Sequence, residues 1–175
     1  DDGLSSMNVM IADLSSNALV RVFPSEPAMS PITATEIAAA IGKLLAQFTR
    51  EDRCTTAAAA VEGDGRFLVI AWEGPPLSGC SHDKIAQVIT AHEARSGCAL
   101  LAAPPIAIGA GAAVRLTDRA GLRHLLETAA CDARTPVWNL RAATVGEWRK
   151  GPEPLSASLW AFLASASPAL DGGLS

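Results

Sequence analysis

Hydrophobic residues recur every three or four positions in several segments, a period that is typical of one face of an α-helix. The clearest case runs over 33–49, and its apolar positions are Ile37, Ile41, Leu44, Leu45 and Phe48. Thr33 and Glu36 have the spacing of a capping box, so we expect this helix to begin there. Weaker patterns of the same period predict two further helices, over 81–96 and 118–131.

Two neighbouring apolar segments, 54–62 and 66–72, are separated by Gly63-Asp64-Gly65. These turn-forming residues allow positive φ, so the pair predicts a β-hairpin. The second arm is an almost continuous apolar run, as in a strand that is buried on both faces. Further strands are expected over 18–23 and 135–140, with two short arms inside 105–116.

Together these elements predict an α/β domain, with an α+β arrangement as the alternative. We expect a mixed sheet with the 66–72 strand at its centre, three main helices packed on it, and short helices near the C-terminus. No linker divides the chain of 175 residues. One domain is therefore expected over 18–165, between a polar lead over 1–17 and a frayed tail over 166–175.

Charge and composition exclude several classes of function. The formal net charge is −4, and no basic run is longer than Arg149-Lys150, which argues against nucleic-acid binding. The apolar stretch 97–114 contains Pro104-Pro105, so we expect a buried loop and strand rather than a membrane span. The acidic, polar first residues differ from a secretion signal. The four cysteines form no CxxC pair, and we expect reduced thiols in a cytoplasmic protein.

Motifs for nucleotides and metals are incomplete. The Gly109-Ala110-Gly111 cluster lacks the lysine of a P-loop, and Val114 stands where a dinucleotide fingerprint needs a small residue. His92 begins an HExxH-like pattern, but Ser96 replaces the second histidine. We therefore expect no cofactor and no metal. His92 is expected to be a partly buried, hydrogen-bonded residue on the apolar face of its helix.

The segment 78–84 joins the buried strand to the second helix, which is where open α/β sheets usually place ligand sites. Free amides at the start of a helix attract anions, so we expect a small anionic ligand here. The same field favours the thiolate form of Cys80, which makes it a candidate catalytic nucleophile or redox centre. The candidate binding residues are Ser78, Gly79, Cys80, Ser81 and Asp83.

A purely structural interpretation of the same segment stays open. Ser78 or Ser81 would cap the helix, Asp83 would offset its dipole, and Cys80 would be a small buried hydrophobic residue. The protein would then be a non-catalytic interaction or assembly subunit, with a protein partner or as a homo-oligomer. Its contact surface would be an exposed apolar patch formed by Trp148, Trp160 and Phe162.

Four segments resemble, in order, a family of small uncharacterised bacterial proteins. They are Gly65-Arg66-Phe67-Leu68-Val69, Ser78-Gly79-Cys80-Ser81-x-Asp83, Thr135-Pro136-Val137-Trp138-Asn139 and Ser158-x-Trp160. The SGCSxD segment is the most specific, and the similarity runs from about Val20 to Phe162. Members are sometimes labelled "ABC transporter ATPase", but a chain without a P-loop lacks the means for that activity. In the resembling family an aliphatic residue usually replaces His82, which implies that a shared function uses the SGCSxD residues instead.

Overall fold

Three antiparallel strands form the larger sheet of the computed structural model, which describes residues 9–165. They are β1 (Leu19–Pro24), β2 (Thr56–Glu62) and β3 (Phe67–Glu73), in the order β1-β3-β2. The expected central strand is confirmed, because β3 pairs with β1 on one edge and with β2 on the other. The side chains of residues 67–72, which alternate between the two faces of the sheet, are all buried. The expected frayed tail and residues 1–8 of the polar lead lie outside the described residues, and within the rest of the lead Leu14 is buried.

The β2–β3 hairpin is also confirmed, and its turn has the predicted positive φ angles. Gly63, Asp64 and Gly65 have φ values of 62°, 54° and 89°. The amide of Met29 donates a 2.8 Å hydrogen bond to the carbonyl of Gly65. A side chain at position 65 would collide with the Met29 backbone, so both the φ angle and the close approach require glycine.

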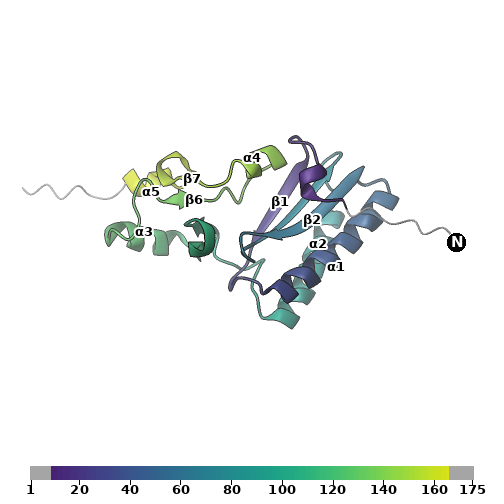
Figure 1. The fold of residues 1–175 in the computed structure, drawn as a ribbon, viewed down its shortest axis with the longest axis horizontal. Coiled ribbons are helices and arrows are strands. Elements are labelled where there is room, and N and C mark those ends of the chain that lie inside the picture. Colours follow the sequence, from purple (N-terminus) through teal and green to yellow (C-terminus); the bar gives the residue numbers. More distant parts are fainter. Residues whose placement is uncertain (1–8, 166–175) are drawn as a thin grey trace, which may run out of the picture.

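Two long helices, α1 (Pro31–Arg50) and α2 (Gly79–Ser96), cover one face of this sheet (Figure 1). The capping box expected at Thr33 is wrong: Ser30 is the N-cap, and its hydroxyl accepts the Thr33 amide. Pro31 then occupies the first helical position, where a missing N–H has no cost. Leu68, Ile70 and Trp72 of β3 point to this side and join the core between the sheet and the helices.

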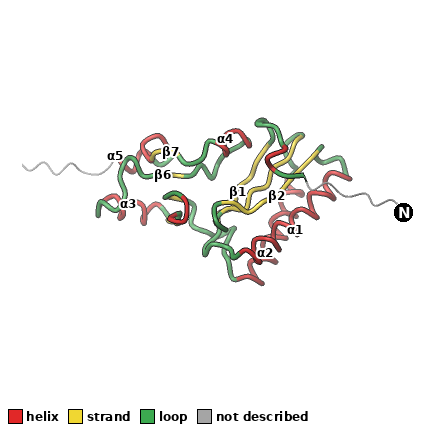
Figure 2. Tube along the Cα trace, viewed as in Figure 1, coloured by secondary structure: helices red, strands yellow, loops and turns green. Residues whose placement is uncertain are grey.

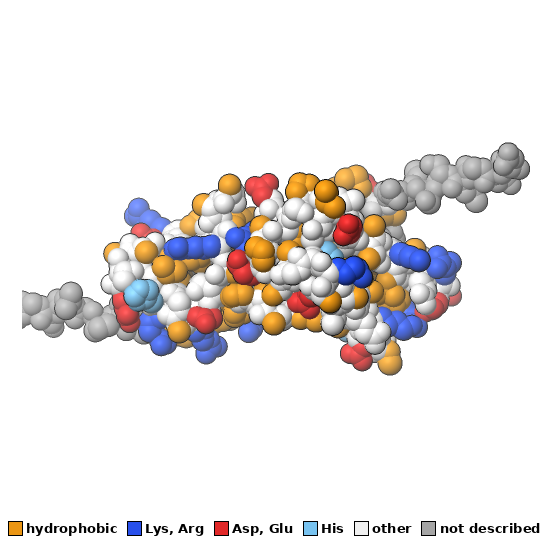
Figure 3. Space-filling model, turned by 90° about the horizontal axis from the view of Figure 1, so that it is seen from below, with side chains coloured by type: hydrophobic (Ala, Val, Ile, Leu, Met, Phe, Trp, Pro, Cys, Tyr) orange, Lys and Arg blue, Asp and Glu red, His pale blue; other side chains and the backbone are white. Residues whose placement is uncertain are grey.

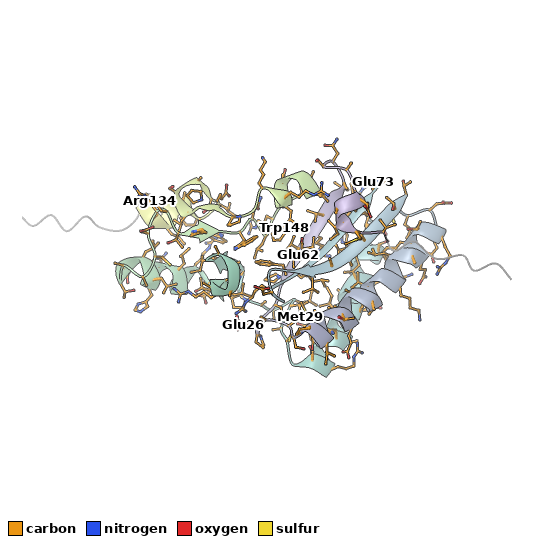
Figure 4. All side chains as sticks on the ribbon, viewed as in Figure 1. Glu26, Met29, Glu62, Glu73, Arg134 and Trp148 are labelled. Atoms are coloured by element: carbon orange, nitrogen blue, oxygen red, sulfur yellow. The ribbon has the colours of Figure 1, made fainter. Side chains whose placement is uncertain are left out.

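The second half of the chain covers the opposite face of the sheet. Phe67 contacts two tryptophans there, with ring centroids 5.0 Å from Trp138 and 5.2 Å from Trp148. The indole N–H of Trp148 also donates a 2.9 Å hydrogen bond to the Glu62 carboxylate, and Figure 4 shows these two side chains between the halves of the molecule. The β3 strand is therefore buried from both sides by different parts of the chain.

A second sheet lies beyond this contact, in the part of Figure 2 that is mostly loop. It has four strands, but each is only two or three residues long. Its order is β5-β4-β6-β7, with every pair antiparallel. The strands are β4 (Ile106–Ile108), β5 (Arg115–Thr117), β6 (Pro136–Val137) and β7 (Glu153–Pro154). The other elements here are η2 (Gly111–Ala113), α3 (Arg119–Glu127), α4 (Val145–Arg149), η3 (Leu155–Ala157) and α5 (Ala161–Ser165); η1 (Ile11–Asp13) precedes β1.

The α+β alternative within the predicted fold class is confirmed, with a different sheet arrangement. The strands form two antiparallel sheets instead of one mixed sheet. The third helix, α3, does not pack on the large sheet, because Leu122 is buried with Ile106, Ile108 and Leu163 in a separate cluster. The short C-terminal helices are confirmed, and Thr144 caps α4 by accepting the Glu147 amide at 3.2 Å.

Candidate functional site

The first turn of α2 is organised by its own serines. Ser78 is the N-cap, and its Oγ accepts the amide of Ser81 at 3.2 Å. The helix thus begins at Gly79, two residues earlier than the sequence pattern predicts. A side chain at Gly79 would meet no atom within 4 Å, so this glycine is not needed for space.

Ser81 connects this turn to the loop after α1. Its side chain is buried, and its Oγ lies 3.1 Å from Ser78 Oγ. Arg53 donates a 2.9 Å hydrogen bond to the same oxygen, pairs with Glu51 at 2.6 Å, and lies over the Phe48 ring. The guanidinium of Arg53 is therefore held beside the helix start by three separate contacts.

A second arginine reaches the turn from β1. Arg21 donates a 3.0 Å hydrogen bond to Nδ1 of His82, whose ring makes an edge contact with Trp72. Burial lowers the pKa of His82, the positive charge of Arg21 lowers it further, and Asp83 acts in the opposite direction. Partial burial also lowers the pKa of Arg21. His82 is thus a neutral hydrogen-bond acceptor at neutral pH, which positions the arginine.

Cys80 and Asp83 are both exposed on this turn, while the thiols of Cys54, Cys98 and Cys131 are buried. The interpretation of Cys80 as a small buried hydrophobic residue is therefore wrong. All four cysteines are free thiols. Within residues 9–165, no hydrogen bond connects the Cys80 sulfur to His82, whose Nδ1 is occupied by Arg21.

The structure thus brings the five predicted residues onto one helical turn, with different exposures. Ser78 and Ser81 use their hydroxyls internally, whereas the amides at the helix start and the Cys80 thiol face outward. Sequence reasoning missed Arg21 and Arg53. Neither belongs to a motif, and each reaches the turn only through strand and loop packing. Two guanidinium groups beside free amides form a setting that can hold an anion.

Other features expected from the sequence also have definite positions. His92 is fully buried, but neither ring nitrogen has a partner within the described part of the chain, so the expected hydrogen-bonded state is wrong. Trp148 and Trp160 are buried, which contradicts the suggested exposed patch; only Phe162 of the three is exposed, at 51%. A groove of about 910 Å³ lies elsewhere, between α1, β2 and residues 9–12.

Across residues 9–165, no helix is both long and apolar enough to cross a membrane. In the same range, no group of three or more His, Cys, Asp or Glu side chains is arranged to hold a metal ion. On the face drawn in Figure 3, acidic and basic side chains are interspersed. Electrostatic attraction for a long polyanion is correspondingly weak on that face.

No protein family, curated protein or solved structure matches this chain. The resemblance to small bacterial proteins with an SGCSxD segment therefore stays a prediction. Inferences about function depend on the geometry of the molecule itself.

Proposed function

We propose that this protein binds a small anionic ligand at the first turn of α2, with the outward amides of Gly79 and Cys80 as donors. The observation that carries the proposal is the position of Arg53, whose guanidinium is fixed 2.9 Å from the buried Ser81 hydroxyl. A cation held in place loses little entropy when an anion binds. Arg21, held by His82, adds a second positive charge next to the turn.

The balance of charge around the turn favours a small ligand over a polyanion. Asp83 and Glu51 offset part of the positive charge of the two arginines and Lys84. Four free thiols support a location in the bacterial cytoplasm, where thiols stay reduced.

The test is a titration with inorganic phosphate or sulfate, followed through the amide NMR signals of Gly79 and Cys80. Arg53→Gln is expected to weaken binding about tenfold or more, because a charge-assisted hydrogen bond contributes roughly 1.5–3 kcal/mol. Arg50→Gln is the matched control, since Arg50 is an exposed arginine at the end of α1. Equal losses in both variants, or amide signals that stay unchanged, would refute the proposal.

A second candidate is a non-catalytic interaction or assembly subunit. The observation that favours it is the open groove beside β2, with exposed Val9 and Met10 at its rim. Apolar side chains exposed at the rim of a groove are typical of binding surfaces. A thiol-dependent enzyme that uses Cys80 is a third candidate, supported by the exposure of this thiol at a helix start.

A further inference from the structure

The groove beside β2 has two walls and a strand at its base. One wall is the face of α1 that carries Ala38, Ala39, Gly42, Lys43 and Ala46, and the other is the segment Val9–Ala12. Between them lie the alanines of β2, over residues 57–60. The volume of about 910 Å³ is open along the length of a seven-residue strand, roughly 23 Å at 3.3 Å per residue.

The outer edge of β2 presents its backbone to this groove. The backbone N–H of Val20 donates to the carbonyl of Ala143, so it points away from β3. Backbone groups alternate between the two edges of a strand. The even-numbered residues of β1 therefore turn their N–H and C=O groups away from β3, and the odd-numbered residues hydrogen-bond to β3. The partners of the odd-numbered β1 residues are the even-numbered residues of β3, so these face β1. The odd-numbered residues of β3 then hydrogen-bond to the even-numbered residues of β2 on the other side. The amides and carbonyls of Ala57, Ala59 and Val61 therefore face the groove, and no backbone partner for them occurs in residues 9–165.

Two residue types that normally protect a strand edge, proline and lysine, are missing from β2. The sequence Thr-Ala-Ala-Ala-Ala-Val-Glu has no proline and no lysine. Such an edge is a template for an added strand. The small side chains on the α1 wall leave room beside it, because alanine and glycine project little from a helix.

The charge in the groove indicates which strand fits. Lys43 is exposed, and it forms no ion pair or hydrogen bond with any other described residue. Glu62, at the far end of β2, already accepts the indole N–H of Trp148. An incoming strand with an acidic side chain would satisfy Lys43. A second copy of β2 has no acidic residue other than Glu62, which already accepts the Trp148 indole, so a symmetric dimer would leave Lys43 without an acidic partner.

We propose that β2 accepts an extended segment of a partner protein as a fourth strand of the large sheet. The segment has aliphatic side chains that alternate along one face, next to α1, and an acidic residue that pairs with Lys43. This inference goes beyond the anion site and names the partner chemistry of the second candidate function. It involves no residue of the α2 turn, so the two proposals can fail independently.

The test uses a capped seven-residue peptide in which valine and threonine alternate and one central position is aspartate, labelled for fluorescence anisotropy. Ala59→Pro is expected to weaken its binding at least tenfold. Proline removes the central outward N–H but no hydrogen bond to β3, so an edge strand tolerates it. Ala59→Ser, which keeps that N–H, is expected to bind like the unmodified protein. The urea denaturation midpoint of each variant shows whether the fold is intact.

Lys43→Glu provides a second test that does not alter the strand. Exposed ion pairs contribute roughly 0.2–1 kcal/mol, so this variant should bind the aspartate peptide up to about fivefold more weakly. It should bind the same peptide with lysine in place of aspartate more tightly than the unmodified protein does. Failure of the peptide to bind at millimolar concentration overturns the proposal. A concentration-dependent dimer that Ala59→Pro abolishes overturns it too, because the occupant is then a second copy of the chain.

Discussion

His92 offers a direct test of how the α1–α2 layer is stabilised. Its side chain is 1% exposed, and both ring nitrogens lack a hydrogen-bond partner among the described residues. A buried polar group without a partner costs about 1–3 kcal/mol relative to its hydrated state. Leucine has a comparable size and no polar atoms to desolvate. We therefore expect His92→Leu to raise the free energy of unfolding by about 1–3 kcal/mol at pH 7.5.

Urea denaturation measures this change. With a slope of about 2 kcal/mol per molar urea, the midpoint should rise by about 0.5–1.5 M without a change in slope. His124→Gln is the control, because His124 is exposed on α3 and its replacement should leave the midpoint unchanged. A lower midpoint for His92→Leu would show that the imidazole contributes an interaction, and the reasoning would fail.

The same residue predicts how stability depends on pH. Burial lowers the pKa of His92, with a smaller effect in the same direction from Arg95, while Glu36 and Glu93 act in the opposite direction. The unfolded chain therefore binds a proton near pH 6.5 that the folded chain does not, and stability falls as pH falls below about 6.5. His92→Leu should reduce this loss, by at most about 1.4 kcal/mol per pH unit. His82 retains its own part, because burial and Arg21 lower its pKa as well.

Three further outcomes are expected. Gly65→Ala should lower the thermal midpoint by several degrees, because the added carbon collides with the Met29 backbone at a positive φ; a midpoint within one degree of the original, by calorimetry, would contradict this. Trp148→Phe should cost about 1–3 kcal/mol in urea denaturation, since it leaves the Glu62 carboxylate without the indole donor, and an unchanged midpoint would show that this hydrogen bond contributes nothing. Iodoacetamide with peptide mapping should modify Cys80 first, because it is the exposed thiol, and the nucleophile hypothesis should be abandoned if it reacts no faster than Cys54, Cys98 or Cys131.

Local patterns in the sequence were sufficient for the elements around the large sheet. The continuous apolar run from Phe67 to Trp72 predicted a central strand, and the flanking glycines predicted the hairpin turn, because both depend on nearby residues. The start of the second helix was also located to within two residues, together with the serines that organise it. These features depend on periodicity and capping, which act over a few residues.

Long-range contacts decided the rest. Nothing in the order of the strands required two antiparallel sheets, and Trp148 is buried only because Phe67 and Glu62 meet it across the molecule. At the candidate site, Arg21 and Arg53 lie far from the SGCSxD segment along the chain, and the groove beside β2 forms between segments that are separate in sequence. Periodicity identifies which face of an element is apolar, but several partners could cover that face with similar free energy. The choice among them depends on the shape and hydrogen bonds of the folded chain.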